Sequence, residues 1–232
     1  MIPLVVIRPQ PGCDATVRAA RARGLAATAH PLFEVGPLAW QAPDPAMFDA
    51  LLIGSANVLR HGGAGLARYQ CMPAYAVGET TAAAVREAGM ELAGVGEGGL
   101  QALLGSLQSG HQRLLRFTAR ERVEVIAPPG VSITEAVTYA SEPRPMPLEL
   151  VELLAGGAVV LLHSGEAARH FAAECDARGI ARRNIAVAAL APRIAAAAGG
   201  GWAAVETAAE PRDQALLALA DQLCQGSGAL DR

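Results

Sequence analysis

The chain has 232 residues, 52% of them apolar, which is enough for one large domain or for two domains of about 100 residues each. Its formal net charge is −3, from 19 basic and 22 acidic residues, and no stretch is strongly basic, so nucleic-acid binding is not expected. All 19 basic residues are arginine, which excludes Schiff-base chemistry on lysine and the lysine of a phosphate-binding P-loop. Recognition of an anion must therefore use arginine, hydroxyl groups or backbone N–H groups.

The sequence also argues against a membrane protein and against a metal centre. No apolar run approaches the roughly 18 residues that a membrane span needs, and the first residues lack the basic start and the apolar stretch of a signal peptide. The four cysteines are far apart, and the five histidines form no H-E-x-x-H pair. We therefore expect a cytoplasmic protein, with reduced cysteines and without a membrane or nucleic-acid partner.

Short β-rich runs alternate with alanine-rich helical runs along the chain. The predicted strands span residues 2–7, 25–35, 49–53, 74–77, 91–95, 113–118, 123–127, 158–163, 185–190 and 202–207. The predicted helices span residues 11–24, 56–61, 79–88, 99–107, 147–154, 165–178, 192–198 and 211–225. Residues 131–140 are expected to be extended and the tail 226–232 disordered. This alternation predicts an α/β fold with parallel sheets covered by helices.

Two features point to two lobes. Residues 33–45 and 131–147 are rich in proline and interrupt the alternation, as connections between lobes do. In addition, residues 51–55 resemble residues 160–164, and the strand and turn at 74–78 resemble those at 186–191. These similarities indicate one strand-turn-helix pattern that is used twice.

Open parallel sheets bind ligands at the carboxyl ends of their strands, where helix N-termini offer N–H groups to anions. Small polar residues or arginine follow the predicted strands at four such turns: Arg8, Ser55, the pair Thr80 and Thr81, and Ser164 with Gly165. Taken singly, each hydroxyl could be a plain helix cap, and Arg8 could form a surface ion pair. Four such turns together favour a cleft that binds an anionic ligand.

A dinucleotide fingerprint is matched only formally. The glycines at 94, 96 and 99 have G-x-G-x-x-G spacing between a predicted strand and a predicted helix, but they do not lie in a first βαβ unit. With 25 glycines in the chain, a glycine-rich turn is the favoured interpretation.

Five segments together resemble the uroporphyrinogen-III synthase family. They are VIRP at 6–9, FDALLIGSANV at 48–58, AVGETTAAAVREAG at 76–89, VTY at 137–139 and LHSGEAARHF at 162–171. Their order and spacing run along nearly the whole chain, and the stretch from 76 to 89 is the most distinctive.

Two positions depart from the family pattern. Residues 115–122 lack the glycines and the following helix that are common before the second linker. In the second-half counterpart of the Thr81 turn, Ile194 replaces a threonine, which puts a ligand role of that turn in doubt.

The resemblance implies two α/β lobes with parallel sheets, joined by two extended linker strands. Residues 1–35 and 145–232 would form the first lobe, residues 45–130 the second, and residues 36–44 and 131–144 the linkers. It also implies the reaction, in which hydroxymethylbilane loses water and cyclises to uroporphyrinogen III with inversion of its last ring. No metal or cofactor is expected.

The resemblance further suggests which residues act. Tyr139 is the candidate catalytic residue, because a phenol that is protonated at neutral pH can donate a hydrogen bond to the departing hydroxyl; the alternative is a linker tyrosine that is only packed. The candidate substrate-binding residues are Arg8, Ser55, Ala56, Thr80, Thr81, Ser164 and Gly165. The expected partners are hydroxymethylbilane and, for transfer of this unstable substrate, hydroxymethylbilane synthase, and the protein is expected to be a monomer. A non-catalytic binding protein for a polyanion and, less favoured, a nicotinamide oxidoreductase remain the alternatives.

Overall fold

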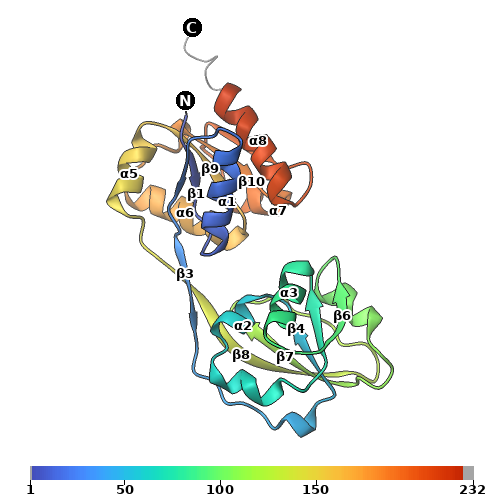
Figure 1. Ribbon diagram of the computed structural model, residues 1–232. Helices are drawn as coiled ribbons and strands as arrows, with labels where there is room; N and C mark the ends of the chain where they lie inside the picture. Colours follow the sequence, from blue (N-terminus) through green and yellow to red (C-terminus); the bar gives the residue numbers. More distant parts are fainter. Residues whose placement is uncertain (1, 227–232) are drawn as a thin grey trace. The chain divides into compact units, whose positions relative to one another are not determined.

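The computed structural model describes residues 2–226 as two compact units. The first unit combines the residues up to Glu34 with those from Glu142 onward, and the second spans Val35–Ser141. In Figure 1 the first unit accordingly contains both the blue and the orange-to-red parts of the chain. The tail that was predicted to be disordered lies, beyond Gly226, outside the described residues.

The first unit contains a five-stranded parallel sheet. Its order is β11 (Ala204–Thr207), β10 (Ile185–Ala189), β9 (Ala158–Leu162), β1 (Leu4–Val6) and β2 (Ala27–Ala29). The central strands are continuous apolar runs because both faces of the sheet are covered. The helices are α1 (Gly12–Ala22), α5 (Leu148–Ala155), α6 (Gly165–Ala177), α7 (Pro192–Ala198) and α8 (Asp213–Gly226).

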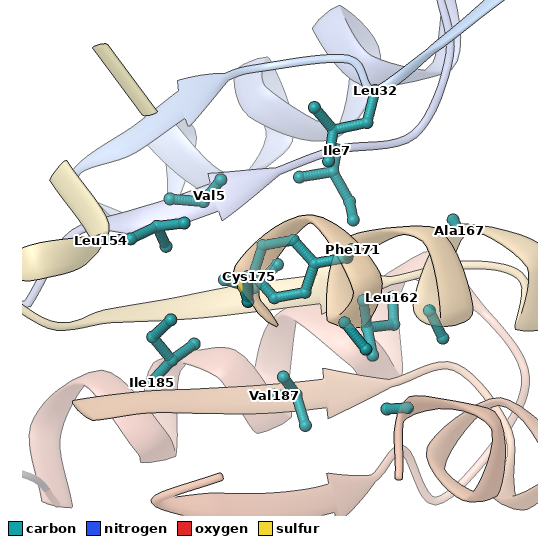
Figure 2. Packing of buried hydrophobic residues seen from close by; sticks show 14 of the residues in the cluster. Val5, Ile7, Leu32, Leu154, Leu162, Ala167, Phe171, Cys175, Ile185 and Val187 are labelled. Atoms are coloured by element: carbon teal, nitrogen blue, oxygen red, sulfur yellow. The ribbon is translucent and has the colours of Figure 1, made fainter. Parts of the chain in front are cut away.

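Alternation along the strands divides the core of this unit in two. Val5 and Val160 pack with α5, α6 and α7 on one face, and Leu4 and Val159 pack with α1 and α8 on the other. Figure 2 shows the first of these cores, in which Phe171 of α6 lies among residues of β9 and β10.

The second unit contains a six-stranded sheet. Its order is β3 (Phe33–Pro37), β8 (Ser132–Pro143), β7 (Arg113–Ala119), β4 (Ala50–Ile53), β5 (Ala74–Val77) and β6 (Leu92–Gly96). The five strands from β8 to β6 pair in parallel. The helices α2 (Asn57–His61) and α3 (Glu79–Glu87) contribute to the core on one face, and α4 (Leu100–Leu103) contributes to the core on the other. Short 3-10 turns span Pro45–Met47, Ala64–Tyr69, Leu104–Ser106 and Arg182–Asn184.

The predicted α/β class with parallel sheets is confirmed, but three predicted elements were wrong. The single strand predicted at 25–35 is two strands, β2 and β3, which belong to different sheets. Pro31 lies between them and has no N–H to continue a ladder. The helix predicted at 99–107 leaves α-helical geometry after Leu103.

The third wrong prediction is the strand at 123–127, which is an irregular segment. Val123 and Ile126 are 75% and 80% exposed, and side chains rather than a neighbouring strand bond their backbone. Part of the linker expected at 131–144 is also regular structure, because residues 132–139 pair with β7. The chain passes between the two units at Glu34/Val35 and at Ser141/Glu142.

Candidate functional site

The second unit has a pocket of about 420 Å³ at the carboxyl ends of its central strands. The sheet order places β5 and β6 on one side of β4, and β7 and β8 on the other, so the chain reverses its direction of winding between β4 and β7. Ligands of open α/β sheets bind at such a switch point. Gly54 and Ser55 line the pocket from the end of β4, Arg116 and Thr118 from β7, and Tyr139 from β8.

A bulge in β8 directs Tyr139. Thr118 pairs with Val137, but the next residue, Ala119, pairs with Tyr139, so that Thr138 is the extra residue. Because side chains alternate along a strand, this insertion turns Tyr139 to the face of Phe117, where it packs in the core and is 8% exposed. Re-aiming a side chain is a common use of a bulge beside a binding site.

The environment keeps the Tyr139 phenol protonated. Burial raises its pKa above the ordinary value of 10, while the Ser55 hydroxyl and the Arg116 charge act in the opposite direction. The ring of His61 in α2 is the aromatic neighbour, with 6.3 Å between the ring centroids. Burial lowers the pKa of His61, as does Arg60, so this ring is neutral at pH 7. Tyr139 is therefore a proton donor that faces a pocket.

Arg116 is a pocket residue that the sequence analysis did not single out. It is 2% exposed in the middle of β7. Its Nη1 donates to Glu135 Oε1 at 2.8 Å and its Nη2 to the carbonyl of Val123 at 2.8 Å. Among the described residues, its Nε has no hydrogen-bond partner. The sequence contains one indication of this residue, because Arg116 interrupts the apolar run of residues 114–117, where burial of a charge is costly.

Residues 120–131, which we call the crossover segment, connect β7 to β8 and form one wall of the pocket through residues 121–125. Arg122 Nε donates to Glu135 Oε2 at 2.6 Å, so that Arg122 and Arg116 share one carboxylate. The Gln101 amide bonds both the N–H and the carbonyl of Ile126, at 2.9 and 3.0 Å. These contacts hold a segment that lacks a helix or strand of its own.

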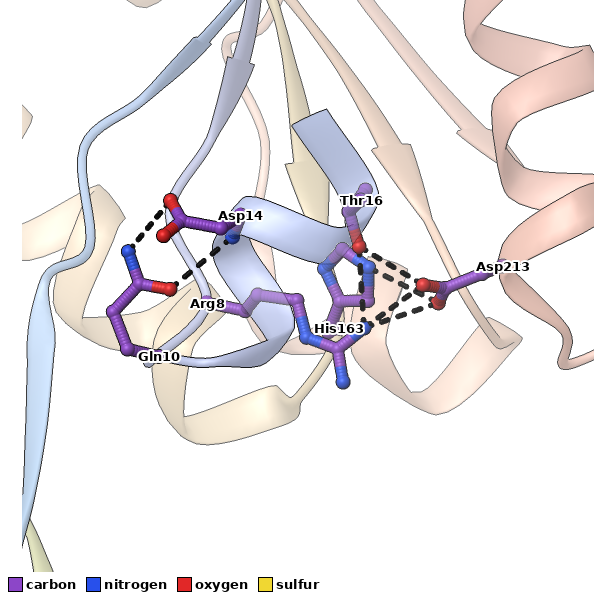
Figure 3. Close-up of polar contacts among 6 residues, drawn as sticks. All are labelled: Arg8, Gln10, Asp14, Thr16, His163 and Asp213. Atoms are coloured by element: carbon purple, nitrogen blue, oxygen red, sulfur yellow. Dashed lines mark hydrogen bonds and ion pairs between the residues drawn. The ribbon is translucent and has the colours of Figure 1, made fainter. Parts of the chain in front are cut away.

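The first unit has a polar cluster at its own switch point, where β1 and β9 end (Figure 3). Arg8 Nη1 donates to both oxygens of Asp213, at 2.9 and 3.2 Å, and the Thr16 hydroxyl donates to Asp213 Oδ2 at 2.9 Å. His163 Nε2 lies 3.3 Å from Asp213 Oδ1. Arg8 thus forms the ion pair that was the alternative to a ligand contact.

The charges of this cluster have clear causes. His163 holds the pKa of Asp213 down to about 2, with Arg8 and Thr16 acting in the same direction and burial opposing them. Burial lowers the pKa of His163, whose side chain is 7% exposed. At neutral pH the cluster therefore consists of an aspartate, an arginine cation and a neutral imidazole.

The remaining predicted residues divide by unit. In the first unit, Ser164 caps α6 by accepting the Ala167 N–H at 3.1 Å, and Gly165 is the first residue of that helix. In the second unit, the Ser55 hydroxyl accepts the Asn57 N–H at 3.2 Å while also lining the pocket. Ala56, the next residue, is buried and does not line the pocket.

The two threonines lie in the first turn of α3 but differ in exposure, since Thr80 is exposed and Thr81 is 5% exposed. Neither lines the pocket. Of the predicted residues, the structure therefore brings Ser55 and Tyr139 together.

Two of the three glycines with dinucleotide spacing serve packing. A Cβ at Gly96 would lie 2.8 Å from Leu103 Cδ1, and one at Gly94 would lie 3.0 Å from the Tyr75 ring. Gly99 has a φ of +96° and precedes α4, a helix of only four residues. Side chains thus fill the space beside Gly94 and Gly96, whereas a Cβ at Gly99 would meet nothing within 4 Å, and Gly99 lines the pocket.

The part of the chain that the structure describes contains neither a cluster of metal-binding side chains nor a helix suited to a membrane. No three His, Cys, Asp or Glu side chains in residues 2–226 are grouped to hold a metal ion. In the same part of the chain, no helix has both the length and the apolar character needed to cross a bilayer.

This geometry defines a class: a two-unit α/β protein with parallel sheets, in which a ligand-sized pocket at a switch point holds a buried phenol and a buried arginine. A family model described as uroporphyrinogen-III synthase HemD matches residues 14–218, so the chain belongs to the uroporphyrinogen-III synthase family. Its function is accordingly uroporphyrinogen-III synthesis, in haem biosynthesis.

Solved structures share the fold. The uroporphyrinogen-III synthetase from Helicobacter pylori 26695 is 18% identical, with a TM-score of 0.65 over 96% of this chain and 100% of that one. A mutant uroporphyrinogen III synthase from the extremely thermophilic bacterium Thermus thermophilus is 16% identical, with a TM-score of 0.54 over 97% and 100%. None of the curated protein sequences is significantly similar to the chain.

Proposed function

We propose that the chain acts as a cyclising hydro-lyase on hydroxymethylbilane and that Tyr139 is its acid. The observation that supports this role is the position of Tyr139, a protonated phenol that lines the switch-point pocket beside Ser55. The pyrrole is electron-rich and expels its own hydroxyl, so the site needs one proton donor rather than a strong acid and base pair.

The proton balance of this step is simple. The C–O bond of the hydroxymethyl group breaks, its electron pair goes to oxygen, and the Tyr139 proton completes a water molecule. The cation that remains is attacked by the α-carbon of the last pyrrole that already carries a methylene bridge, so one C–C bond forms and the bond from this carbon to its bridge then breaks. The cation released on the bridge is attacked by the free α-carbon of the same pyrrole, which inverts the ring. The proton lost from this second carbon returns to the Tyr139 oxygen. The pocket would contribute by holding the chain in the geometry that gives isomer III.

The carboxylates of the substrate need several donors. We assign these contacts to Arg8, Ser55, Ala56, Thr80, Thr81, Ser164 and Gly165, with Ala56, Thr81 and Gly165 acting through their backbone N–H groups. Ser164 and Gly165 begin α6, and the two threonines lie in the first turn of α3. N–H groups at a helix N-terminus and arginine side chains both favour carboxylates. Among the described residues, the hydrogen bonds of Arg8 to Asp213 and Thr16 use only its Nη1, which leaves Nη2 and Nε for a carboxylate of the substrate.

Several finer expectations belong to the same proposal. The protein would work in the cytoplasm as a monomer, and it would receive hydroxymethylbilane from hydroxymethylbilane synthase because this substrate closes spontaneously. No metal or cofactor takes part in the proposed reaction.

The deciding experiment is incubation of the purified protein with hydroxymethylbilane and separation of the product isomers. Isomer III in excess of the spontaneous isomer I is the expected result. If binding of a polyanion is measurable while isomer I remains the only product, the chain is the non-catalytic binding protein of the alternative.

A further inference from the structure

Arg116 lies at a buried position, where a charge has a high desolvation free energy. It lies in β7, which is paired on both sides, by β4 and by β8, and only 3% of its side chain is exposed. Replacing a buried ion pair with apolar residues is often neutral or stabilising, so stability alone does not require a charge at this position. The Nε of Arg116, which has no hydrogen-bond partner within residues 2–226, adds to the free-energy cost of burial.

The counter-charge of Arg116 is incomplete. Glu135 binds Arg116 with Oε1 and Arg122 with Oε2, so one carboxylate serves two guanidinium groups. The side chains of Arg122 and Glu135 are 35% and 29% exposed and are therefore screened by water more than Arg116 is. A net positive charge remains on the buried side of this triad.

Tyr139 is the pocket group on which this charge can act. Arg116 reaches the pocket from the face of Leu114, and Tyr139 reaches it from the face of Phe117. The other charged or titratable groups that line the pocket or lie against the phenol are the neutral His61 ring of α2 and the exposed Glu121, Arg122 and Glu124 of the crossover segment. Because buried charges interact more strongly than solvated ones, Arg116 dominates this set.

We propose that Arg116 is a positioning residue for the reaction, whose buried positive charge stabilises the tyrosinate that Tyr139 becomes when it protonates the departing hydroxyl. This inference rests on the proposed function of Tyr139. The charge on the phenol oxygen exists only after proton transfer, so a fixed cation nearby favours the transition state over the ground state.

The free enzyme offers a test that needs no substrate. The ultraviolet absorbance of tyrosinate is titrated in the wild type and in Y139F, and the difference isolates Tyr139 from Tyr69 and Tyr75. We expect R116Q to move this titration to higher pH, because the stabilising cation is lost. E135Q should move it to lower pH, because Arg116 loses its counter-charge, and R116K should leave it near the wild-type position.

A matched control lies in the same strand. Arg113 begins β7 and pairs with Asp49 at 2.6 Å, and neither residue lines the pocket. R113Q should therefore leave the Tyr139 titration unchanged. Circular dichroism identifies any variant that does not fold, and R116K and E135Q keep the test decisive if R116Q is such a variant.

Turnover provides the second readout. R116Q should reduce kcat about tenfold or more with little change in KM, and R116K should stay within about threefold of wild type. If the guanidinium group of Arg116 served only to hold the Val123 carbonyl, both substitutions would remove this contact and would reduce kcat equally. Equal losses in R116Q and R116K, or one Tyr139 titration shared by all variants, would overturn the proposal. Absence of isomer III from the wild type would instead refute the proposed function and leave the titration result standing.

Discussion

Ala119 of β7 lies opposite Tyr139 of β8, because the register between the two strands shifts after Thr118. In an unshifted ladder, Thr138 would lie opposite Ala119 and Tyr139 would point to the other face of the sheet. The shifted position buries the ring beside Phe117 and leaves the phenol at the pocket. The insertion of Thr138 thus brings Tyr139 to the pocket.

The first prediction concerns the Tyr139 hydroxyl. Tyr139→Phe keeps the ring in its core and removes only the proton donor, so we expect kcat to fall about 100-fold or more while the melting temperature changes little. Isomer III formation and thermal unfolding of the same sample measure both quantities.

Tyr69→Phe is the matched control for this substitution. The Tyr69 hydroxyl donates to the Pro43 carbonyl at 2.7 Å in the same unit but does not line the pocket. Its loss should cost about 1 kcal/mol of stability without slowing turnover. Equal effects of the two substitutions on kcat would remove Tyr139 from the mechanism.

The second prediction separates two adjacent threonines. Thr80 is exposed and Thr81 is 5% exposed, although both lie in the first turn of α3. Only the Thr80 hydroxyl is open to a carboxylate, and a hydrogen bond to a charged group contributes roughly 1.5–3 kcal/mol. Thr80→Ala should therefore lower kcat/KM about tenfold, whereas Thr81→Ala should mainly lower the melting temperature.

Serine substitutions complete this comparison. Thr80→Ser keeps the hydroxyl and should retain most of kcat/KM. Ile194→Ala, at the counterpart turn, removes a side chain that is 1% exposed and should act on stability alone. The opposite pattern, with Thr81→Ala reducing kcat/KM of the folded protein, would return the substrate contact to Thr81.

Much of the fold follows from local sequence. The run at Ala158–Leu162 is continuously apolar because both faces of β9 are covered, and α7 begins at Pro192 and ends before Gly199, as the helix signals predict. The segment at 123–127 shows why such patterns fail. Its alternating residues are typical of a strand, but a strand also needs a neighbouring strand with which its backbone can pair. A local sequence pattern does not show whether such a neighbour is available.

The site depended on contacts that are distant in sequence. Ser55 and Tyr139 line the same pocket because of the order of the strands in the sheet. Asp213 contacts Arg8, although 205 positions separate the two residues in the sequence. The role of Tyr139 came from the family resemblance, while Arg116 was missed because its burial depends on Glu135 in the next strand. Sequence patterns therefore indicated the turns, but not which charges are paired or buried.

The third prediction tests the glycine-rich turn. Gly96→Ala places a Cβ 2.8 Å from Leu103 Cδ1, so the side chain or the backbone of α4 must move. Overpacking of this kind costs about 1–3 kcal/mol. We expect lower stability and no binding of a nicotinamide dinucleotide by either the variant or the wild type, measured by thermal unfolding and by calorimetric titration. Dinucleotide binding that Gly96→Ala abolishes would revive the oxidoreductase alternative.

The last prediction concerns acid stability of the first unit. The pKa of Asp213 is about 2 in the folded protein, below its ordinary value of 3.8. The unfolded chain therefore binds this proton at a higher pH than the folded chain does. Stability from Asp213 is fully present above about pH 4 and is lost as the pH falls toward about 2. Asp213→Asn should lower stability at neutral pH and flatten its decline between these values.

Fluorescence of Trp202 can report this unit alone once Trp40→Phe has removed the other tryptophan. In that background, urea unfolding at a series of pH values should show a smaller effect for Arg8→Gln than for Asp213→Asn, because His163 and Thr16 remain beside the carboxylate. Asp49, whose pKa is also about 2, belongs to the second unit and should not contribute to this signal. An unchanged pH dependence in Asp213→Asn would show that the Arg8 ion pair does not stabilise the switch point of the first unit.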